Sequence, residues 1–183
     1  MKSNQFFDNF KPSLLDRINT FYYRLLGVKI GSSSYIMYGA KLERNIKNII
    51  IGNNVIIKPF ARICSCNDTS IIKIDNYVTI GHYSFIYSSI EISIGSHVMI
   101  APFAYIVDSN HNIDKNDLMI FQKNTSDSIK IESDVWIGQN STILKGVVIS
   151  TGSVIGAKSL VSKSTESYEI HAGVPNKLIG LRK

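Results

Sequence analysis

The chain has few cysteines, no long apolar run and no recognisable secretory leader. Cys64 and Cys66 are its two cysteines. They are too few for a structural zinc site, so we interpret them as turn residues in a reducing compartment, with a dithiol or metal-binding pair as the alternative. No stretch approaches the roughly 20 apolar residues that span a bilayer, and residues 1–10 lack a basic region leading into an apolar one. We therefore expect one cytoplasmic domain.

A concentrated basic stripe is also missing. The net charge is +6, but the individual lysines and arginines are spread along the chain and are not interleaved with stacking aromatic residues, as a nucleic-acid interface requires. We expect no nucleic-acid partner. Most cations are interpreted as solvated, with a few available to a phosphorylated cofactor.

The sequence has instead a six-residue period in its second half. Ile or Val stands at every sixth position from residue 131 to residue 161, and four residues after each of them stands a small or β-branched residue. The same phrase recurs upstream, beginning at Ile51, Ile74 and Ile94, each followed by isoleucines six and twelve residues later. The repeated positions in the second half are Ile131, Ile137, Ile143, Ile149, Ile155 and Val161.

This period predicts a parallel β-helix. Each hexapeptide supplies a short strand and a corner, and about three of them complete one turn of the coil. Every unit buries its isoleucine, and β-branched side chains suit such a stacked, pleated core. The fold class predicted is therefore all-β over residues 28–166.

The segment Ser13–Leu26 departs from this period. Its apolar residues recur at spacings of three and four, Ser13 and Asp16 form a possible capping box, and Gly27 suits a helix end. We predict an amphipathic helix within residues 1–27 that covers the open end of the first coil or packs on a neighbouring subunit. Its aromatic and arginine content leaves a second interpretation, peripheral contact with the inner face of a membrane or with a lipid-linked substrate.

Two interruptions break the array. The stretch Cys64–Ile72 is short and is interpreted as a widened corner. The segment 108–128 is too long for a corner and is rich in Asp, Asn, Ser and Lys. An inserted loop on a rigid scaffold can present polar groups without disturbing the core, so we expect the functional residues there.

Three phrases besides the repeat resemble the hexapeptide-repeat acyltransferases, in particular the galactoside and maltose acetyltransferases. They are His111 standing sixteen residues after Gly95, the run Asp134-Val-Trp-Ile-Gly138, and the run from Ala172 to Ile179. The resemblance implies a left-handed coil and a closing C-terminal segment at 167–183 with a short basic tail. It also implies a homotrimer with active sites between subunits.

The same resemblance implies that His111 is the catalytic base. A neutral imidazole can accept the proton of an alcohol as it attacks a thioester. Asp108 and Asp114 are candidates for orienting the ring, and a backbone N–H near Gly138 or Gln139 is the candidate oxyanion donor. His82 and His97 are interpreted as structural corner residues.

Acetyl-coenzyme A is the co-substrate that the resemblance implies, with no metal required. Carried over position by position, its contacts fall on eight residues. Small ones would let the pantetheine arm lie against the coil, and the basic ones would meet phosphates. They are Trp136, Gly138, Gln139, Ala157, Ser162, Lys163, Lys177 and Arg182.

The acceptor is implied less directly. The asparagine that binds the sugar in the galactoside enzymes corresponds here to Tyr87 or Ser88, so the specificity differs. The helix followed at once by the coil is similar to bacterial O-acetyltransferases of lipopolysaccharide, capsule or exopolysaccharide. We expect a glycan hydroxyl as acceptor. The alternatives are N-acetylation of an amino sugar or antibiotic and a non-catalytic binding or assembly protein. The paired histidines of hexapeptide-type carbonic anhydrases are absent.

Overall fold

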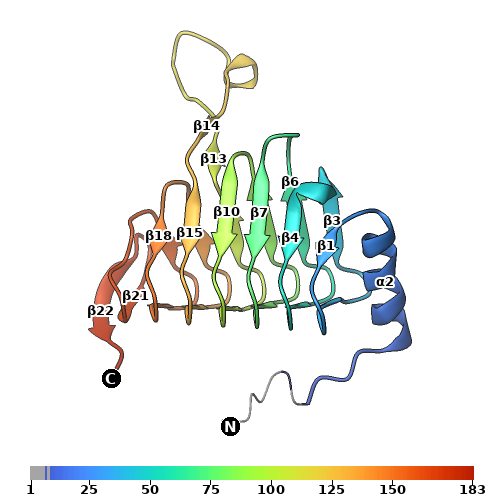
Figure 1. The fold of residues 1–183 in the computed structure, drawn as a ribbon. Coiled ribbons are helices and arrows are strands. Elements are labelled where there is room, and N and C mark those ends of the chain that lie inside the picture. Colours follow the sequence, from blue (N-terminus) through green and yellow to red (C-terminus); the bar gives the residue numbers. More distant parts are fainter. Residues whose placement is uncertain (1–6, 8) are drawn as a thin grey trace.

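The computed structural model describes residue 7 and residues 9–183, and most of the chain beyond residue 28 winds into one parallel β-helix (Figure 1). Three sheets, named A, B and C here, form its walls, and successive coils add one strand to each. Sheet A contains β1 (Lys29–Ile30), β4 (Ile49–Ile51), β7 (Ile71–Ile74), β10 (Glu91–Ile94), β15 (Ile129–Ile131) and β18 (Val148–Ile149). Sheet C contains β3 (Lys41–Arg44), β6 (Arg62–Ser65), β9 (Phe85–Ser88), β12 (Tyr105–Val107), β17 (Thr142–Ile143) and β20 (Leu160–Val161).

Sheet B is longer because the C-terminal segment joins it. It contains β2 (Tyr35–Ile36), β5 (Ile56–Ile57), β8 (Thr79–Ile80), β11 (Met99–Ile100), β16 (Trp136–Ile137), β19 (Val154–Ile155), β21 (Glu169–Ala172) and β22 (Lys177–Leu181). The closing segment predicted at 167–183 is mostly a strand pair, because β21 adds to β19 in parallel and β22 then folds back on β21.

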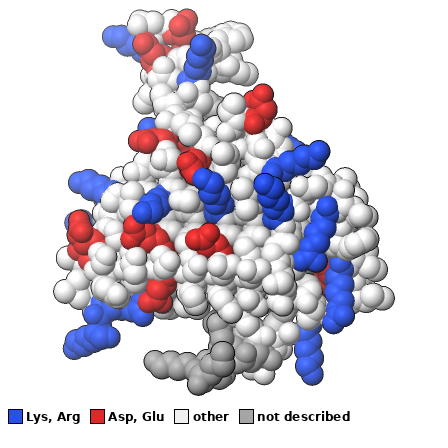
Figure 2. Space-filling view, viewed as in Figure 1, with Lys and Arg blue, Asp and Glu red and all other residues white. Residues whose placement is uncertain are grey.

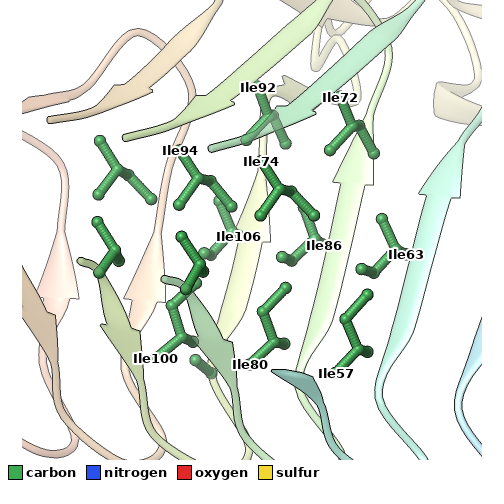
Figure 3. Close-up of a cluster of buried hydrophobic side chains, with 14 of the residues drawn as sticks. Ile57, Ile63, Ile72, Ile74, Ile80, Ile86, Ile92, Ile94, Ile100 and Ile106 are labelled. Carbon is green, nitrogen blue, oxygen red and sulfur yellow. The ribbon is translucent and has the colours of Figure 1, made fainter. Parts of the chain in front are cut away.

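The ladders place the repeated isoleucines directly over one another. Ile131 pairs with Ile149, 18 positions on, which equals three hexapeptides per coil and confirms the predicted turn length. Figure 3 shows part of the three resulting columns, whose members are at most 3% exposed. The columns are Ile51, Ile74, Ile94, Ile131 and Ile149; Ile57, Ile80, Ile100, Ile137 and Ile155; and Ile63, Ile86, Ile106, Ile143 and Val161.

The companion positions of the repeat are buried as well, although several of them are serine. The hydroxyl of Ser141 donates to the carbonyl oxygen of Gly156 at 2.9 Å, and that of Ser153 donates to the carbonyl oxygen of Glu166 at 2.9 Å. A buried hydroxyl costs little when it satisfies a corner carbonyl that the ladder leaves unpaired. Serine and valine can therefore alternate at this position.

Helix α2 (Leu14–Leu25) covers the open end of the first coil and begins with the predicted capping box. Ser13 Oγ accepts from the Asp16 N–H at 3.2 Å, and Asp16 Oδ2 accepts from the Ser13 N–H at 2.8 Å. Gly27 follows the helix with a φ of +89°, a backbone conformation that glycine adopts without strain. Both predicted ends of the helix are therefore confirmed.

The side of α2 that faces the coil is polar. The Asn19 amide donates to the Ile36 carbonyl oxygen at 3.0 Å, and Thr20 Oγ1 accepts from the Ile36 N–H at 2.9 Å. Further along, the Tyr23 hydroxyl accepts from the backbone N–H of Leu42 at 3.0 Å. No coil precedes β2 and β3, so their backbone groups would otherwise lack partners. Polar side chains of α2 supply these hydrogen-bond partners.

Asp16 is central to this cap and provides a stability test. Burial alone would raise its pKa, but hydrogen bonds from the Tyr38 N–H and from Ser13 together hold the pKa below its ordinary value. A depressed carboxyl pKa stabilises the fold above the unfolded pKa near 3.9, and this stabilisation is lost as pH falls through the folded value.

We expect Asp16→Ala to lower the free energy of unfolding by about 2 kcal/mol at neutral pH. Urea unfolding of both proteins should show the difference shrinking below about pH 4, where the wild-type carboxyl becomes protonated. Asp16→Asn, which keeps one acceptor oxygen, should lose less. A difference that stays constant across this pH range would contradict the assignment.

The predicted widened corner joins β6 to β7 and lies on the edge between sheets C and A. Ser65 Oγ and Ser70 Oγ lie 2.7 Å apart across it, and the Asn67 side chain accepts from the Ser70 N–H at 2.7 Å. Both cysteines are free, and Cys66 Sγ lies 3.3 Å from Ser89 Oγ in the next coil. Within residues 7 and 9–183, no cluster of three or more metal-binding side chains is present.

Candidate active site

The inserted loop leaves the β-helix after β12 and returns at β15. A short antiparallel ladder closes its base, in which β13 (Ser109–Asn110) pairs with β14 (Thr125–Ser126). Figure 1 shows the rest of the loop, including the short 3-10 helix η2 (Met119–Phe121), projecting beyond the edge of the coil. His111 follows β13 directly and therefore lies at the neck of the projection, next to the rigid scaffold.

Asp108 anchors this neck to the preceding coil. It is fully buried, and its Oδ2 accepts from the Ser88 hydroxyl at 2.8 Å and from the Ile90 N–H at 2.9 Å. Its Oδ1 accepts from the Ser89 N–H at 2.6 Å. Both carboxylate oxygens are thus engaged in the corner between β9 and β10. No hydrogen bond joins Asp108 to His111 within the chain. The structure therefore gives no support to an orienting role for Asp108.

Asp114 is also occupied within the loop. The backbone N–H of Asp114 donates to the Gln122 side-chain oxygen at 2.9 Å. The Gln122 side-chain amide donates to the backbone carbonyl oxygen of Asp114 at 2.7 Å. Its carboxylate accepts from the N–H of Asn116. His111 itself is exposed and has no hydrogen-bond partner in the part of the chain that the structure describes. Neither carboxylate proposed to orient the ring contacts it in a single chain.

A groove of about 640 Å³ opens beside His111 on the outer face of sheet C. Phe85 and Tyr105 stack at its floor with ring centroids 5.8 Å apart. Asn110 and Asn124 contribute polar groups near the histidine. Stacked rings beside amides and an imidazole suit the apolar faces and polar edges of a sugar ring.

The two acceptor-binding candidates separate in the structure. Tyr87 lines the groove, and burial together with its contact to Cys66 raises the pKa of its hydroxyl to about 12, so the hydroxyl stays protonated. Ser88 is fully buried and belongs to the anchor of Asp108. Phe85 and Tyr105 are not among the predicted acceptor-binding residues. Each stands next to a column isoleucine, however, at a strand position whose side chain points outward.

Trp136 lies on a different wall from His111. It is half exposed on sheet B, between Met99 and Val154 of the neighbouring strands. It lines a second, mainly apolar groove of about 340 Å³ together with Met99, Pro102 and Lys58. This groove could receive an apolar arm such as pantetheine.

Gly138 and Ala157 form adjacent corners of two successive coils. A Cβ on Gly138 would lie 2.5 Å from the Ala157 nitrogen, so no side chain fits there. The Gly138 N–H donates to the Ile155 carbonyl oxygen at 2.7 Å and is used by the ladder. The N–H of Gln139 has no partner within the described chain. Of the two candidate oxyanion donors, only that of Gln139 is available.

The remaining cofactor candidates lie on other edges of the coil. Ser162 and Lys163 follow β20, where sheet C turns toward sheet A, and Lys177 begins β22. Arg182 donates to Asp134 Oδ2 at 2.9 Å and to the Gly152 carbonyl oxygen at 3.1 Å. Its guanidinium therefore holds the C-terminal strand against the coil, whereas Lys163 and Lys177 are exposed and form no ion pair with any residue that the structure describes.

Two of the other three histidines have structural surroundings. His97 stacks on Tyr77 with centroids 5.0 Å apart, at a corner between sheets A and B. His171 is buried and lies 2.8 Å from the Glu169 carboxylate, and this hydrogen bond lowers the pKa of Glu169. No helix among the described residues is long and apolar enough to cross a membrane.

Comparison with known proteins yields a family model, relatives and solved structures. The model "Bacterial transferase hexapeptide (six repeats)" matches residues 128–163. The putative lipopolysaccharide biosynthesis O-acetyl transferase WbbJ of Escherichia coli K12 is 32% identical over 144 residues, which are 74% of this chain and 73% of WbbJ. The probable acetyltransferase Rv3034c of Mycobacterium tuberculosis is 30% identical over 113 residues, 61% of this chain but only 38% of that relative.

Among solved structures, the S84C mutant of AntD is similar over 90% of this chain and 89% of its own, with a TM-score of 0.81 and 26% identity. AntD is an N-acyltransferase from Bacillus cereus, in complex there with dTDP-4-amino-4,6-dideoxyglucose and coenzyme A. A coil of the opposite hand would not superpose over this length. The predicted fold, a left-handed parallel β-helix with an N-terminal helix, is therefore confirmed.

Proposed function

Because this chain belongs to the hexapeptide-repeat acyltransferases, which use acyl-coenzyme A, we propose that it is an O-acetyltransferase. Its acceptor would be a sugar hydroxyl of a surface polysaccharide, such as lipopolysaccharide, capsule or exopolysaccharide, or of its precursor. The observation that carries this proposal is the position of His111 beside an aromatic-floored groove able to hold a sugar ring.

The chemistry follows from the ionisation of imidazole, whose unperturbed pKa is near 6.5. Neutral His111 accepts the hydroxyl proton as the sugar oxygen attacks the thioester carbonyl and the C–O bond forms. The Gln139 N–H would stabilise the oxyanion of the tetrahedral intermediate. When the C–S bond breaks, the imidazolium returns the proton to the thiolate of coenzyme A.

The separation of these groups supports an active site shared between copies of the chain. His111 lies on the edge where sheet C meets sheet A, whereas Trp136 lines a groove on sheet B. The loop tip also carries Ile120 and Phe121, which are 83% and 80% exposed. Apolar side chains grouped at such exposure generally meet a partner. We place the loop of one subunit on the sheet B groove of its neighbour, in a homotrimer.

Acylation of a sugar amine is the second candidate. AntD, a structural relative over nine-tenths of this chain, holds an amino sugar linked to dTDP. A neutral amine attacks a thioester with less help from a base than a hydroxyl needs. The groove beside His111 would admit either acceptor, so the nature of the product must distinguish them.

One experiment tests both candidates. The purified protein is mixed with acetyl-coenzyme A and a panel of polysaccharide repeat units, nucleotide sugars and amino sugars, while release of free thiol is followed. Each product is separated from acetyl-coenzyme A and then treated with hydroxylamine at alkaline pH, which cleaves acetyl esters and leaves amides intact. We expect thiol release with a sugar acceptor and a cleavable product. An uncleavable product would support the second candidate, and no release with any acceptor would contradict both.

A further inference from the structure

Helix α2 has an unusual distribution of side chains. Its polar residues face the coil because they cap the backbone edges of β2 and β3. Its apolar residues therefore face outward, at positions that share one face of a helix. They are between 52% and 72% exposed, and Tyr22 also makes an edge-to-face ring contact with Tyr23 of the same helix. This apolar face comprises Leu14, Leu15, Ile18, Phe21, Tyr22 and Leu25.

The cations are spread along the chain, but acids are scarce at the end that carries α2, so most of the net positive charge lies there. Residues 11–50 run from α2 through the first coil to the start of β4. They contain seven Lys or Arg and two Asp or Glu, which accounts for five of the six net charges. One of the two acids, Asp16, is buried on the side of α2 that faces the coil, and the other, Glu43, pairs with Arg62 at 2.7 Å. Figure 2 shows cations gathered at this end with few acids between them.

We propose that the end of the β-helix that carries α2 binds an anionic membrane surface. An apolar helix face with aliphatic and aromatic residues, flanked by cations such as Arg17 and Lys47, suits insertion at the boundary between headgroups and acyl chains. Each nearby cation adds attraction to anionic lipids. With α2 lying on the membrane, the groove on sheet C is at the side of the molecule and stays accessible to the acceptor.

A second copy of the chain is a poorer occupant of this face. A head-to-head pair would bring together two ends that each carry most of the net positive charge, and like charges repel. Anionic headgroups complement that charge. The proposal is independent of which acceptor the enzyme uses, because α2 contributes no residue to either groove.

Vesicle flotation tests it with the full chain. Phosphatidylcholine vesicles are compared with vesicles that contain about one third phosphatidylglycerol. We expect binding to the anionic vesicles only, weakened when salt is raised from about 0.1 to about 0.5 M. Ile18→Ser/Phe21→Ser/Leu25→Ser should lower binding at least about tenfold while leaving thermal unfolding and activity on a soluble acceptor unchanged.

The matched control is Leu178→Ser/Ile179→Ser/Leu181→Ser, which removes three similarly exposed apolar residues from β22 at the other end. This control should bind like the wild type. Equal binding of the helix variant and the wild type, or no binding to anionic vesicles, would overturn the proposal. So would a change of mass in sedimentation velocity on mutating the helix, because the face would then belong to an interface between copies.

Discussion

Replacing His111 with alanine should lower kcat by about 10²- to 10⁴-fold, the usual contribution of a general base. The sugar hydroxyl would then have to lose its proton to water, while every group proposed to hold coenzyme A stays in place. Steady-state kinetics with the acceptor found in the panel would measure the loss. Calorimetric titration with coenzyme A should give an unchanged affinity.

The matched control for this prediction is His97→Ala. This histidine stacks on Tyr77 at a distant corner, so its loss should leave kcat within about twofold of the wild type. Wild-type turnover in His111→Ala would refute the base assignment. Mixed oligomers of His111→Ala and Trp136→Ala subunits should regain activity, because some interfaces would join an intact histidine to an intact tryptophan. Failure of every mixture would contradict a site shared between subunits.

Replacing Asp108 with alanine should lower the free energy of unfolding by about 3 kcal/mol. The carboxylate accepts three hydrogen bonds while fully buried, and its loss leaves the N–H groups of Ser89 and Ile90 without partners. Activity should fall as well, because this residue holds the neck that positions His111. Urea unfolding and kinetics would measure the two effects.

Asp108→Asn separates anchoring from an electrostatic role. The amide keeps one acceptor oxygen, so about half of the lost stability should return. If Asp108 acts only as an anchor, the pH profile of kcat should keep the wild-type midpoint. A shift of the acidic limb by about one pH unit or more would show that the carboxylate acts on the ionisation of His111 and would contradict the anchoring assignment.

The groove on sheet C illustrates what could be predicted for the site. The long interruption of the repeat located the loop, and its histidine could be identified from the resemblance. The aromatic floor could have been predicted too, since Phe85 and Tyr105 each precede a column isoleucine and must point to the opposite face of the strand. Their position beside His111 depends on how the loop leaves the coil after β12, which no spacing encodes.

The hydrogen-bond partners of the polar residues could not be predicted from regular spacings along the chain. Ser88 and Asp108 meet because corners of different lengths stack on the same edge. The upstream coils vary in length. Ile57 pairs with Ile80, which stands 23 positions later, whereas Ile80 pairs with Ile100, which stands 20 positions later. The ion pair of Arg182 with Asp134 has a similar origin, because the returning C-terminal strand brings the two residues together.

The coil, the isoleucine columns, the helix with its capping box and the position of the inserted loop follow from the amino-acid sequence. These features depend on local periods that decide which side chains can be buried together. Three others become visible only in three dimensions. Helix α2 turns its polar face inward, Asp108 anchors the loop, and His111 lies on the edge between sheets C and A whereas Trp136 lies on sheet B. The reason is that backbone groups at a coil edge and at a corner take their hydrogen bonds from whatever the fold brings beside them.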